Sequence, residues 1–426
     1  MKTFSAPKSW LMAIITILFA ISCPMAFLKV PPTMILLIEH FQVNLTVVGL
    51  LMTVPSIAIF IAAVPAGVIC AKWGAKATLF AAMGAAIIGN ALGAISGEIV
   101  SYPMILVARF FDGVSFSIAG VGAVAVISMW FPKQKRGLPM AIFAVWVAFG
   151  QLIVFNAAAP IVDVFGSWQA LWWSLIVYAV IVGALFGLIV KKPQPGEGAE
   201  EDEEAPQVEG KKPSILEGFK LPFAWMIAGM DLLFTIMYSV FNNYYATYMQ
   251  NVMGMDLGAA NSLYSITVAA NIFGCIVAGF IMIKVNKDKH PLFLTIILVP
   301  LAIGAVMQFL ITGTVVLLPF LLIFGFINQF PKAIYFTIAP NLSPNQRAIG
   351  PVMSVITLGQ ALGGVIGPML VGPFVENATG YTWTNLAPLQ GVVMVLMLAL
   401  SLLLIREAGK LKKQREAVQE TVVDQA

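Results

Sequence analysis

The sequence predicts an all-α polytopic membrane protein with twelve transmembrane helices in two pseudo-symmetric six-helix halves. Sixty per cent of the 426 residues are hydrophobic and only 10% are charged, whereas a soluble domain carries roughly 25% charged residues. The apolar residues form twelve long stretches, and a local pattern in the first half of the chain recurs in the second. So little charge excludes a water-soluble protein of this length.

Each apolar stretch is long enough to cross a bilayer, because a hydrocarbon core about 30 Å thick needs roughly 20 apolar residues in a helix. The first half holds stretches at 10–40, 46–70, 77–96, 102–125, 138–161 and 168–189. The second half holds stretches at 222–248, 257–284, 291–312, 316–338, 348–372 and 384–405.

A segment rich in acidic residues and proline separates the two sets of stretches. Such a composition cannot bury an apolar core, so we expect a disordered linker. We therefore predict an N-terminal six-helix bundle at 1–190, a cytoplasmic linker at 191–220, a C-terminal six-helix bundle at 221–406 and a cytoplasmic tail at 407–426.

The basic residues predict the orientation, since lysine and arginine collect on the cytoplasmic side. With both termini inside, 21 of the 24 basic residues are cytoplasmic and the other three lie within spans. We expect a multi-pass protein of the plasma membrane, surrounded by lipid and monomeric. The net charge of +4 follows from this topology and indicates no nucleic-acid partner.

An internal repeat links the halves. Gly67, Lys72 and Gly74 recur 212 residues later as glycine, lysine and Asn286. Glycine and asparagine most readily adopt a left-handed turn, so we expect both loops to reverse in the same way. The pattern favours a duplicated six-helix unit.

The sequence resembles the major facilitator superfamily of secondary transporters along nearly its whole length. The resemblance rests on the loop from Gly67 to Lys76, on Arg109-Phe-Phe-Asp112-Gly113 in the fourth span, and on Trp130-Phe-Pro followed by Arg136-Gly. It implies a fold of two six-helix halves and transport by alternating access. Ala71 stands where the superfamily's loop motif has an acidic residue that helps to latch the cytoplasmic side, so the latch must differ.

A narrower resemblance points to the cyanate and 2-nitroimidazole permease branch. It rests on the segments from Phe27 to Pro32 and from Val48 to Pro55. In that branch a basic residue sits in the first span, where this chain has Lys29.

Five charged residues lie in the interior of the predicted spans, although each costs roughly 2.5–3.5 kcal/mol at a helix centre. They occupy only spans one, four, seven and ten, which line the central cavity in the superfamily. They are Lys29, Arg109, Asp112, Asp231 and Lys332.

Their roles have alternatives. Lys29 is too deep in its span to reach the interface, which favours a solute ligand. Lys332 could bind solute or extend to the interface. Arg109 could contribute to solute binding, or Arg109 and Asp112 could simply neutralise each other. Asp231 or Asp112 could carry a coupled proton. Asp231 could instead form an ion pair with Lys332 or Lys29, or it could simply line the hydrated wall of the cavity.

Neutral polar side chains complete the candidate site. Amides and phenols beside a buried cation suit a small anion that needs several hydrogen bonds, although they also join helices. The candidates are Asn242, Asn243, Tyr244 and Asn328.

Glycines spaced by four predict close helix packing. Such pairs occur at Gly89 and Gly93 in the third span and at Gly359, Gly363 and Gly367 in the eleventh.

The leading hypothesis is a secondary active transporter of a small anionic solute, with proton coupling as an added element. The alternative within the same fold is a drug or metabolite exporter, which two basic residues in the cavity disfavour. A membrane enzyme would need a concentrated catalytic set, and the chain offers none. Three cysteines in apolar stretches and two histidines indicate no metal site, and we expect no cofactor.

Overall fold

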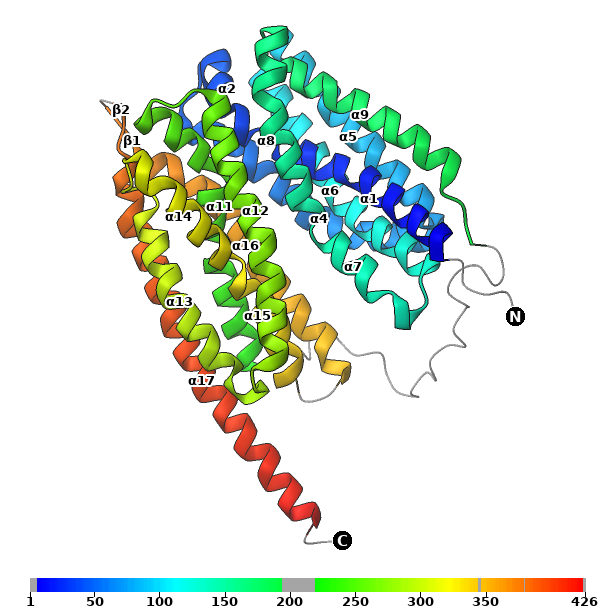
Figure 1. Cartoon of the computed structure of the whole chain (residues 1–426), viewed down its shortest axis with the longest axis vertical. Coiled ribbons are helices and arrows are strands. Elements are labelled where there is room, and N and C mark those ends of the chain that lie inside the picture. The colour runs from blue at the N-terminus through cyan, green and yellow to red at the C-terminus, as the bar shows by residue number, and fades with distance from the viewer. Residues whose placement is uncertain (1–5, 194–218, 344–345, 379, 424–426) are drawn as a thin grey trace. The chain divides into compact units, whose positions relative to one another are not determined.

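The computed structural model describes residues 6–193, 219–343, 346–378 and 380–423, which are nearly all helical (Figure 1). The described residues form two compact units. Unit 1 comprises residues 6–193 and 249–265, and unit 2 comprises residues 219–248 and 266–423. The central part of the expected linker lies outside the described residues.

Unit 1 contains the first six spans, three of which are interrupted or extended by short helices. Its helices are α1 Ala6–Leu28, η1 Pro31–Thr33, α2 Met34–Phe41, α3 Leu45–Val48, α4 Leu50–Trp73, α5 Ala75–Glu98, α6 Tyr102–Trp130, η2 Lys133–Lys135, α7 Gly137–Ala144, α8 Trp146–Phe165 and α9 Gln169–Ile189.

Unit 2 contains most of the remaining spans and one small antiparallel strand pair. Its elements are α11 Pro222–Met253, α12 Leu257–Lys284, η3 Lys287–Lys289, α13 His290–Met307, α14 Thr314–Asn328, α15 Phe330–Leu342, α16 Gln346–Val375, β1 Glu376–Asn377, β2 Gly380–Tyr381, η4 Trp383–Asn385 and α17 Leu386–Val423. Residues 249–265 at the α11–α12 junction group with unit 1.

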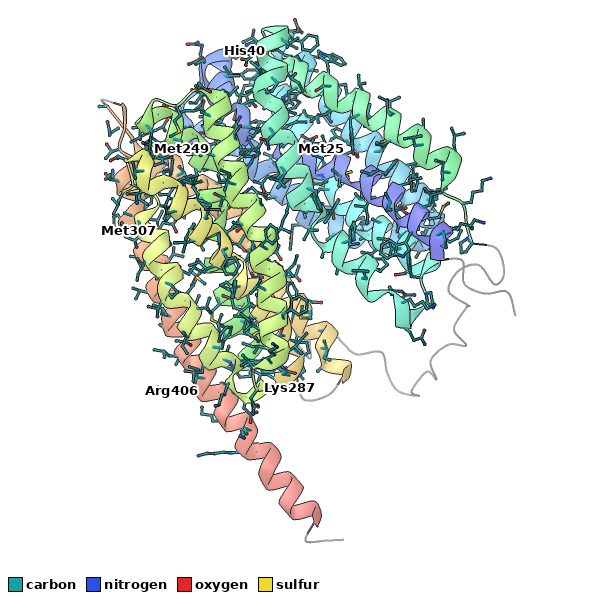
Figure 2. The ribbon with its side chains drawn as sticks, in the orientation of Figure 1. Met25, His40, Met249, Lys287, Met307 and Arg406 are labelled. Atoms are coloured by element: carbon teal, nitrogen blue, oxygen red, sulfur yellow. The ribbon has the colours of Figure 1, made fainter. Side chains whose placement is uncertain are left out.

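Twelve helical segments of the described chain are long and apolar enough to cross a membrane. This confirms the twelve predicted spans. Lys287 and Arg406 lie at one end of unit 2 and Met307 lies at the other (Figure 2). The last helix does not end with the apolar stretch but continues through the expected tail to Val423.

Prolines interrupt spans one and ten next to the two buried lysines. Pro31 and Pro32 follow Lys29 and end α1, because proline has no N–H for the helical hydrogen bond. In span ten, α15 begins at Phe330 with Pro331 in its first turn, where no helical N–H bond is needed. Helices broken within the membrane are typical of transporter binding sites.

The glycine-rich face of α16 packs directly on the backbone of α11. A Cβ atom at Gly359 would lie 2.0 Å from the carbonyl oxygen of Ala228, and one at Gly363 would lie 2.5 Å from that of Leu232. At Gly367 it would lie 1.9 Å from the hydroxyl of Ser239. The predicted close packing of the eleventh span is therefore confirmed.

The two repeat-related loops reverse differently. Gly74 adopts φ +81° between α4 and α5, in the region that favours glycine. Asn286 has φ −57° and ψ 133°, and its side chain accepts a hydrogen bond from the backbone N–H of Asp288. The prediction that both loops use a left-handed residue is wrong at Asn286, where the side chain stabilises the turn instead.

Candidate functional site

Lys29, Asp112 and Arg109 form one completely buried ionic cluster in unit 1. The Asp112 Oδ2 atom lies 2.9 Å from the Lys29 ammonium and 2.7 Å from Arg109 Nη1. None of the three side chains is exposed. One carboxylate between two cations leaves this cluster with a net charge of +1.

Lys29 has two further partners. Its ammonium donates to Asn90 Oδ1 on α5 at 2.7 Å and lies 3.6 Å from the ring centre of Trp172 on α9. A cation over an indole ring is stabilised by about 2 kcal/mol when both are desolvated. A carboxylate, an amide and an aromatic face therefore surround this ammonium.

Arg109 completes the hydrogen bonding of the broken first span. In a continuous helix the carbonyl of Phe27 would accept from residue 31, but Pro31 has no N–H. Arg109 Nη2 donates to that carbonyl at 2.6 Å, and Nη1 donates to the carbonyl of Ala26 at 2.9 Å. Nε donates to the carbonyl of Leu51 on α4 at 2.8 Å. The guanidinium thus joins α1, α4 and α6.

Two glycines of α5 make room for the cluster. A Cβ atom at Gly89 would lie 2.6 Å from Asp112 Oδ1, and one at Gly93 would lie 1.8 Å from the Trp172 ring. The predicted close packing at both glycines is confirmed, and it brings α6 and α9 onto the α5 face that carries Asn90. Asp112 Oδ1 is buried and has no hydrogen-bond partner.

The second ion pair within the spans lies in unit 2, and it is partly exposed. Lys332 Nζ is 3.4 Å from Asp231 Oδ1, and the Lys332 side chain is 22% exposed whereas that of Asp231 is 2% exposed. Of the alternatives for Asp231, the structure shows the pair with Lys332. This pair is longer and more open than the cluster of unit 1.

The neutral polar candidates fall into two groups. Asn242, Asn243 and Tyr244 are buried on α11, and the Tyr244 hydroxyl donates to the carbonyl of Pro368 on α16 at 2.9 Å. Asn328, at the end of α14, is completely buried, and neither side-chain polar atom has a hydrogen-bond partner. Asn328 therefore has unused donors and an unused acceptor.

The loop motif after span two has one structural lysine and one exposed lysine. Lys76 donates to the carbonyls of Gly187 and Val190 at 2.8 and 2.7 Å, and so caps the end of α9. Lys72 and Ala71 are exposed, and a Cβ atom at Gly67 would meet nothing within 4 Å.

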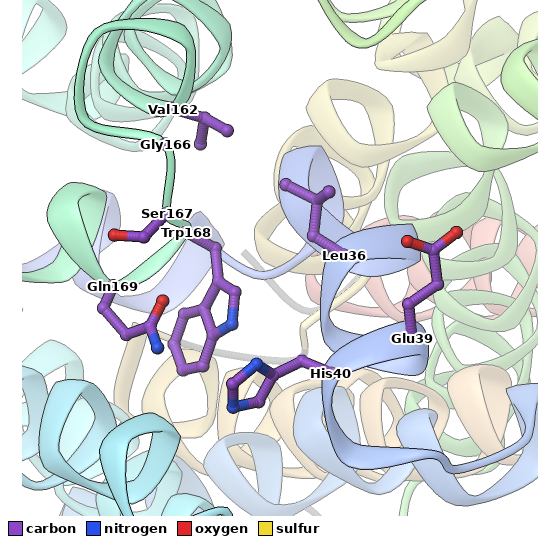
Figure 3. A pocket seen from close by; sticks show the side chains of 8 residues that line it. All are labelled: Leu36, Glu39, His40, Val162, Gly166, Ser167, Trp168 and Gln169. Atoms are coloured by element: carbon purple, nitrogen blue, oxygen red, sulfur yellow. The ribbon is translucent and has the colours of Figure 1, made fainter.

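A separate pocket of about 470 Å³ lies between α2 and the turn from α8 to α9 (Figure 3). The polar residues among those that line it are Glu39, His40, Ser167, Trp168 and Gln169. His40 Nε2 contacts the carbonyl of Gly97 at 2.8 Å, so this nitrogen carries a proton. None of the five buried charges lines this pocket.

Sequence reasoning identified the charged residues but missed Asn90, Trp172 and Tyr335. Asn90 was detectable as an amide in the middle of an apolar span. Trp172 carried no signal, because its role depends on the packing of α9 against Gly93. The Tyr335 hydroxyl is buried without a partner, and its position three residues after Lys332 places both on one side of the helix.

Twelve membrane-spanning helices with ion pairs buried inside them are features of a polytopic transport protein. Residues 10–368 match the family model of the Major Facilitator Superfamily, and the chain belongs to this superfamily. It is a multi-pass membrane transporter and not an enzyme.

One curated relative is a putative metabolite transport protein, NicT, from Pseudomonas putida. It is 25% identical over 287 residues, which cover 63% of this chain and 64% of NicT. The matched region thus spans somewhat less than two thirds of that relative.

Solved structures show the same fold. A bacterial homologue of the human lysosomal transporter Spinster has a TM-score of 0.80 at 15% identity, with 96% of this chain and 99% of that chain covered. A D-xylose–proton symporter has a TM-score of 0.66 at 13% identity, with 92% and 97% covered. The resemblance to the cyanate and 2-nitroimidazole permease branch stays a prediction.

Proposed function

We propose that this secondary transporter moves a small anionic solute across the plasma membrane. The observation that supports the proposal is a partly exposed cation inside a membrane span. The Lys332 side chain is 22% exposed and its carboxylate partner Asp231 lies 3.4 Å away, so the ammonium has room for a second anionic partner. A charged side chain within a span is costly and usually marks a solute or ion pathway.

The two lysines have different parts in this proposal. Lys332 is the cation with space for a new partner, because it is partly exposed and its carboxylate partner lies 3.4 Å away. Lys29 already contacts Asp112, Asn90 and the Trp172 ring, so its part is to hold the helices of unit 1 together. Arg109 holds the broken first span of the same unit.

The amide and phenol groups would supply neutral hydrogen bonds. Asn328 is the best placed, since it lies one helical turn from Lys332 and has no partner in the structure. Asn242, Asn243 and Tyr244 on α11 are further candidates. Tyr244 already bonds Pro368, so its part is to hold α11 against α16.

Coupling to a proton is the second element of the proposal. Asp231 is a better candidate than Asp112, because Asp112 is completely buried and already ion-paired to two cations. Asp231 has Lys332 as its single ion-pair partner among the described residues.

The remaining elements are the membrane topology and the assembly. We place both termini in the cytoplasm, following the distribution of basic residues, and assign the halves to 1–190 and 221–406, joined by 191–220. The tail at 407–426 is cytoplasmic, and the transporter works as a monomer by alternating access.

The test is uptake by proteoliposomes. Small radiolabelled anions, including formate, acetate and nitrate, are offered with and without an inward proton gradient, alongside neutral and cationic solutes of similar size. We expect uptake of an anion that the gradient accelerates. Lys332→Gln should abolish it, whereas Lys410→Gln, a change to an exposed lysine of α17, should not. Uptake of cationic or neutral solutes alone would contradict the proposal and favour the exporter alternative.

A further inference from the structure

A stripe of side chains on α14 and α15 that includes Lys332, the ion-pair partner of Asp231, contains more hydrogen-bond donors than it uses. Asn328, Lys332 and Tyr335 follow one another at spacings of four and three residues, which places them on one helix face. Gln329, at the junction of α14 and α15, keeps a right-handed helical backbone, so the face continues across the junction.

Two members of this stripe are buried and unpartnered. Asn328 is 0% exposed and Tyr335 is 1% exposed, and the Asn328 amide and the Tyr335 hydroxyl have no hydrogen-bond partner. Most buried polar groups in proteins are hydrogen-bonded, so a pair of orphans on one face needs an explanation. A ligand with several acceptor atoms would satisfy both.

The third member, Lys332, is bound by a carboxylate from the protein itself. Asp231 Oδ1 lies 3.4 Å from the ammonium, beyond the usual range for a charge-assisted hydrogen bond of about 2.7–2.9 Å. The carboxylate therefore sits beside the donors without engaging them fully.

From this arrangement we infer that Asn328, Lys332 and Tyr335 form a carboxylate-binding site, and that Asp231 is a built-in substitute for the solute carboxylate. When a solute carboxylate binds, it takes the Lys332 ammonium and accepts from Asn328 and Tyr335. Asp231 then loses its cation partner in a buried position, where an unpaired charge is unfavourable.

The displaced Asp231 takes up one proton. The carboxylate becomes a neutral carboxylic acid, and the proton comes from the water that reaches Lys332. The groups that act on Asp231 from the packed elements are Lys332 and Tyr335 on α15, and the described face of α16 against this part of α11 is glycine-rich. One anion and one proton therefore load together, and the loaded site carries no more charge than the empty one.

This inference rests on the proposed anion transport and adds the solute class and the way in which the proton is coupled. A measurement of binding separates the two. Purified protein in lipid nanodiscs is titrated with sodium formate at pH 7 in a weakly buffered solution, and both formate binding and proton uptake are recorded.

We expect the wild-type protein to take up about one proton per bound formate. Asp231→Asn removes the internal competitor, so formate should bind about tenfold more tightly. This factor corresponds to a wild-type site that Asp231 leaves free about one tenth of the time. That variant should take up no proton. Lys332→Gln should lose formate binding.

Tyr335→Phe has a matched control. Tyr245 in the same unit also has a buried hydroxyl with no hydrogen-bond partner, but it packs in an aromatic cluster with Tyr248 and Phe309. We expect Tyr335→Phe to weaken formate binding by at least about tenfold, because the charged carboxylate loses a hydrogen-bond donor. Tyr245→Phe should bind formate as the wild-type protein does.

Several outcomes would overturn the inference. These are formate binding to wild-type protein without proton uptake, proton uptake that persists in Asp231→Asn, or equal effects of the two tyrosine changes. If chloride competed with labelled formate as strongly as unlabelled formate does, the site would recognise charge alone, and this result would also count against the inference.

If liposomes transport no anion but the binding results hold, the proposed function fails and the carboxylate site stands. If anion transport is insensitive to changes at Asp231 and Tyr335, the carboxylate site fails and the proposed function stands.

Discussion

Replacement of Asp112 by asparagine tests the ionic cluster of unit 1 most directly. The change keeps the size of the side chain but leaves Lys29 and Arg109 buried without a counter-charge. Stranding a buried charge by removal of its partner destabilises proteins by about 3–5 kcal/mol. We expect a loss in this range, because neither Asn90 nor the backbone carbonyls around Arg109 carry a full negative charge.

The loss of stability caused by Asp112→Asn should depend on whether Lys29 is present. Lys29→Gln alone should cost less than Asp112→Asn, because Asp112 keeps Arg109 at 2.7 Å. In the double variant only one buried cation remains, and Arg109 retains three backbone carbonyls. The double variant should therefore be more stable than the sum of the single effects predicts, by at least about 1 kcal/mol.

The assay is reversible unfolding in mixed detergent micelles, followed by tryptophan fluorescence. Asp163→Asn is the matched control, since Asp163 is exposed at the end of α8 and surface changes usually stay within about 0.5 kcal/mol. An Asp112→Asn protein as stable as this control, or a strictly additive double variant, would refute the account of the cluster.

Three further predictions concern packing, the loop motif and topology. Gly359→Ala should lower stability by about 1–3 kcal/mol through overpacking, whereas Gly350→Ala on the same helix has open space and should change little; thermal melting of both variants decides this. Lys76→Met should lower stability by about 1–2 kcal/mol, because two carbonyls at the end of α9 lose their donor, and Lys72→Met should have no comparable effect in the same assay. In a background without the native cysteines, Asp163→Cys should react with an impermeant maleimide on intact cells, and protection until the membrane is opened would contradict the proposed orientation.

Much of the fold was predictable because hydrophobic length and charge placement are read directly from residues. The twelve spans follow from uninterrupted apolar stretches, and Gly89, Gly93 and Gly359 indicated close packing through their spacing. The loop at Asn286 was not predictable in the same way. Asparagine can take a left-handed backbone or use its side chain to stabilise a turn, and only the local geometry shows which.

The candidate site was predictable as a set of residues but not as a set of partners. A charge in an apolar span is evident in the sequence, yet nothing there shows that Lys29 pairs with Asp112 while Asp231 pairs with Lys332. Those pairings depend on how α1 meets α6 and how α11 meets α15. The contribution of Trp172 is a further example, since it requires a glycine on one helix and an indole on another.

The last helix gives the transporter a rod that extends beyond its twelfth span. Of the 38 residues of α17, residues 406–423 follow the apolar stretch, and at a rise of about 1.5 Å per residue this part is about 27 Å long. Lys412 ties it to Asp288 at 2.7 Å. A reporter domain fused in continuous helical register after this rod would be held at a fixed direction. Each inserted residue would rotate the reporter by about 100° around the helix axis. The C-terminus is therefore a suitable attachment point for an orientation marker in electron microscopy or for a polarised fluorescent label.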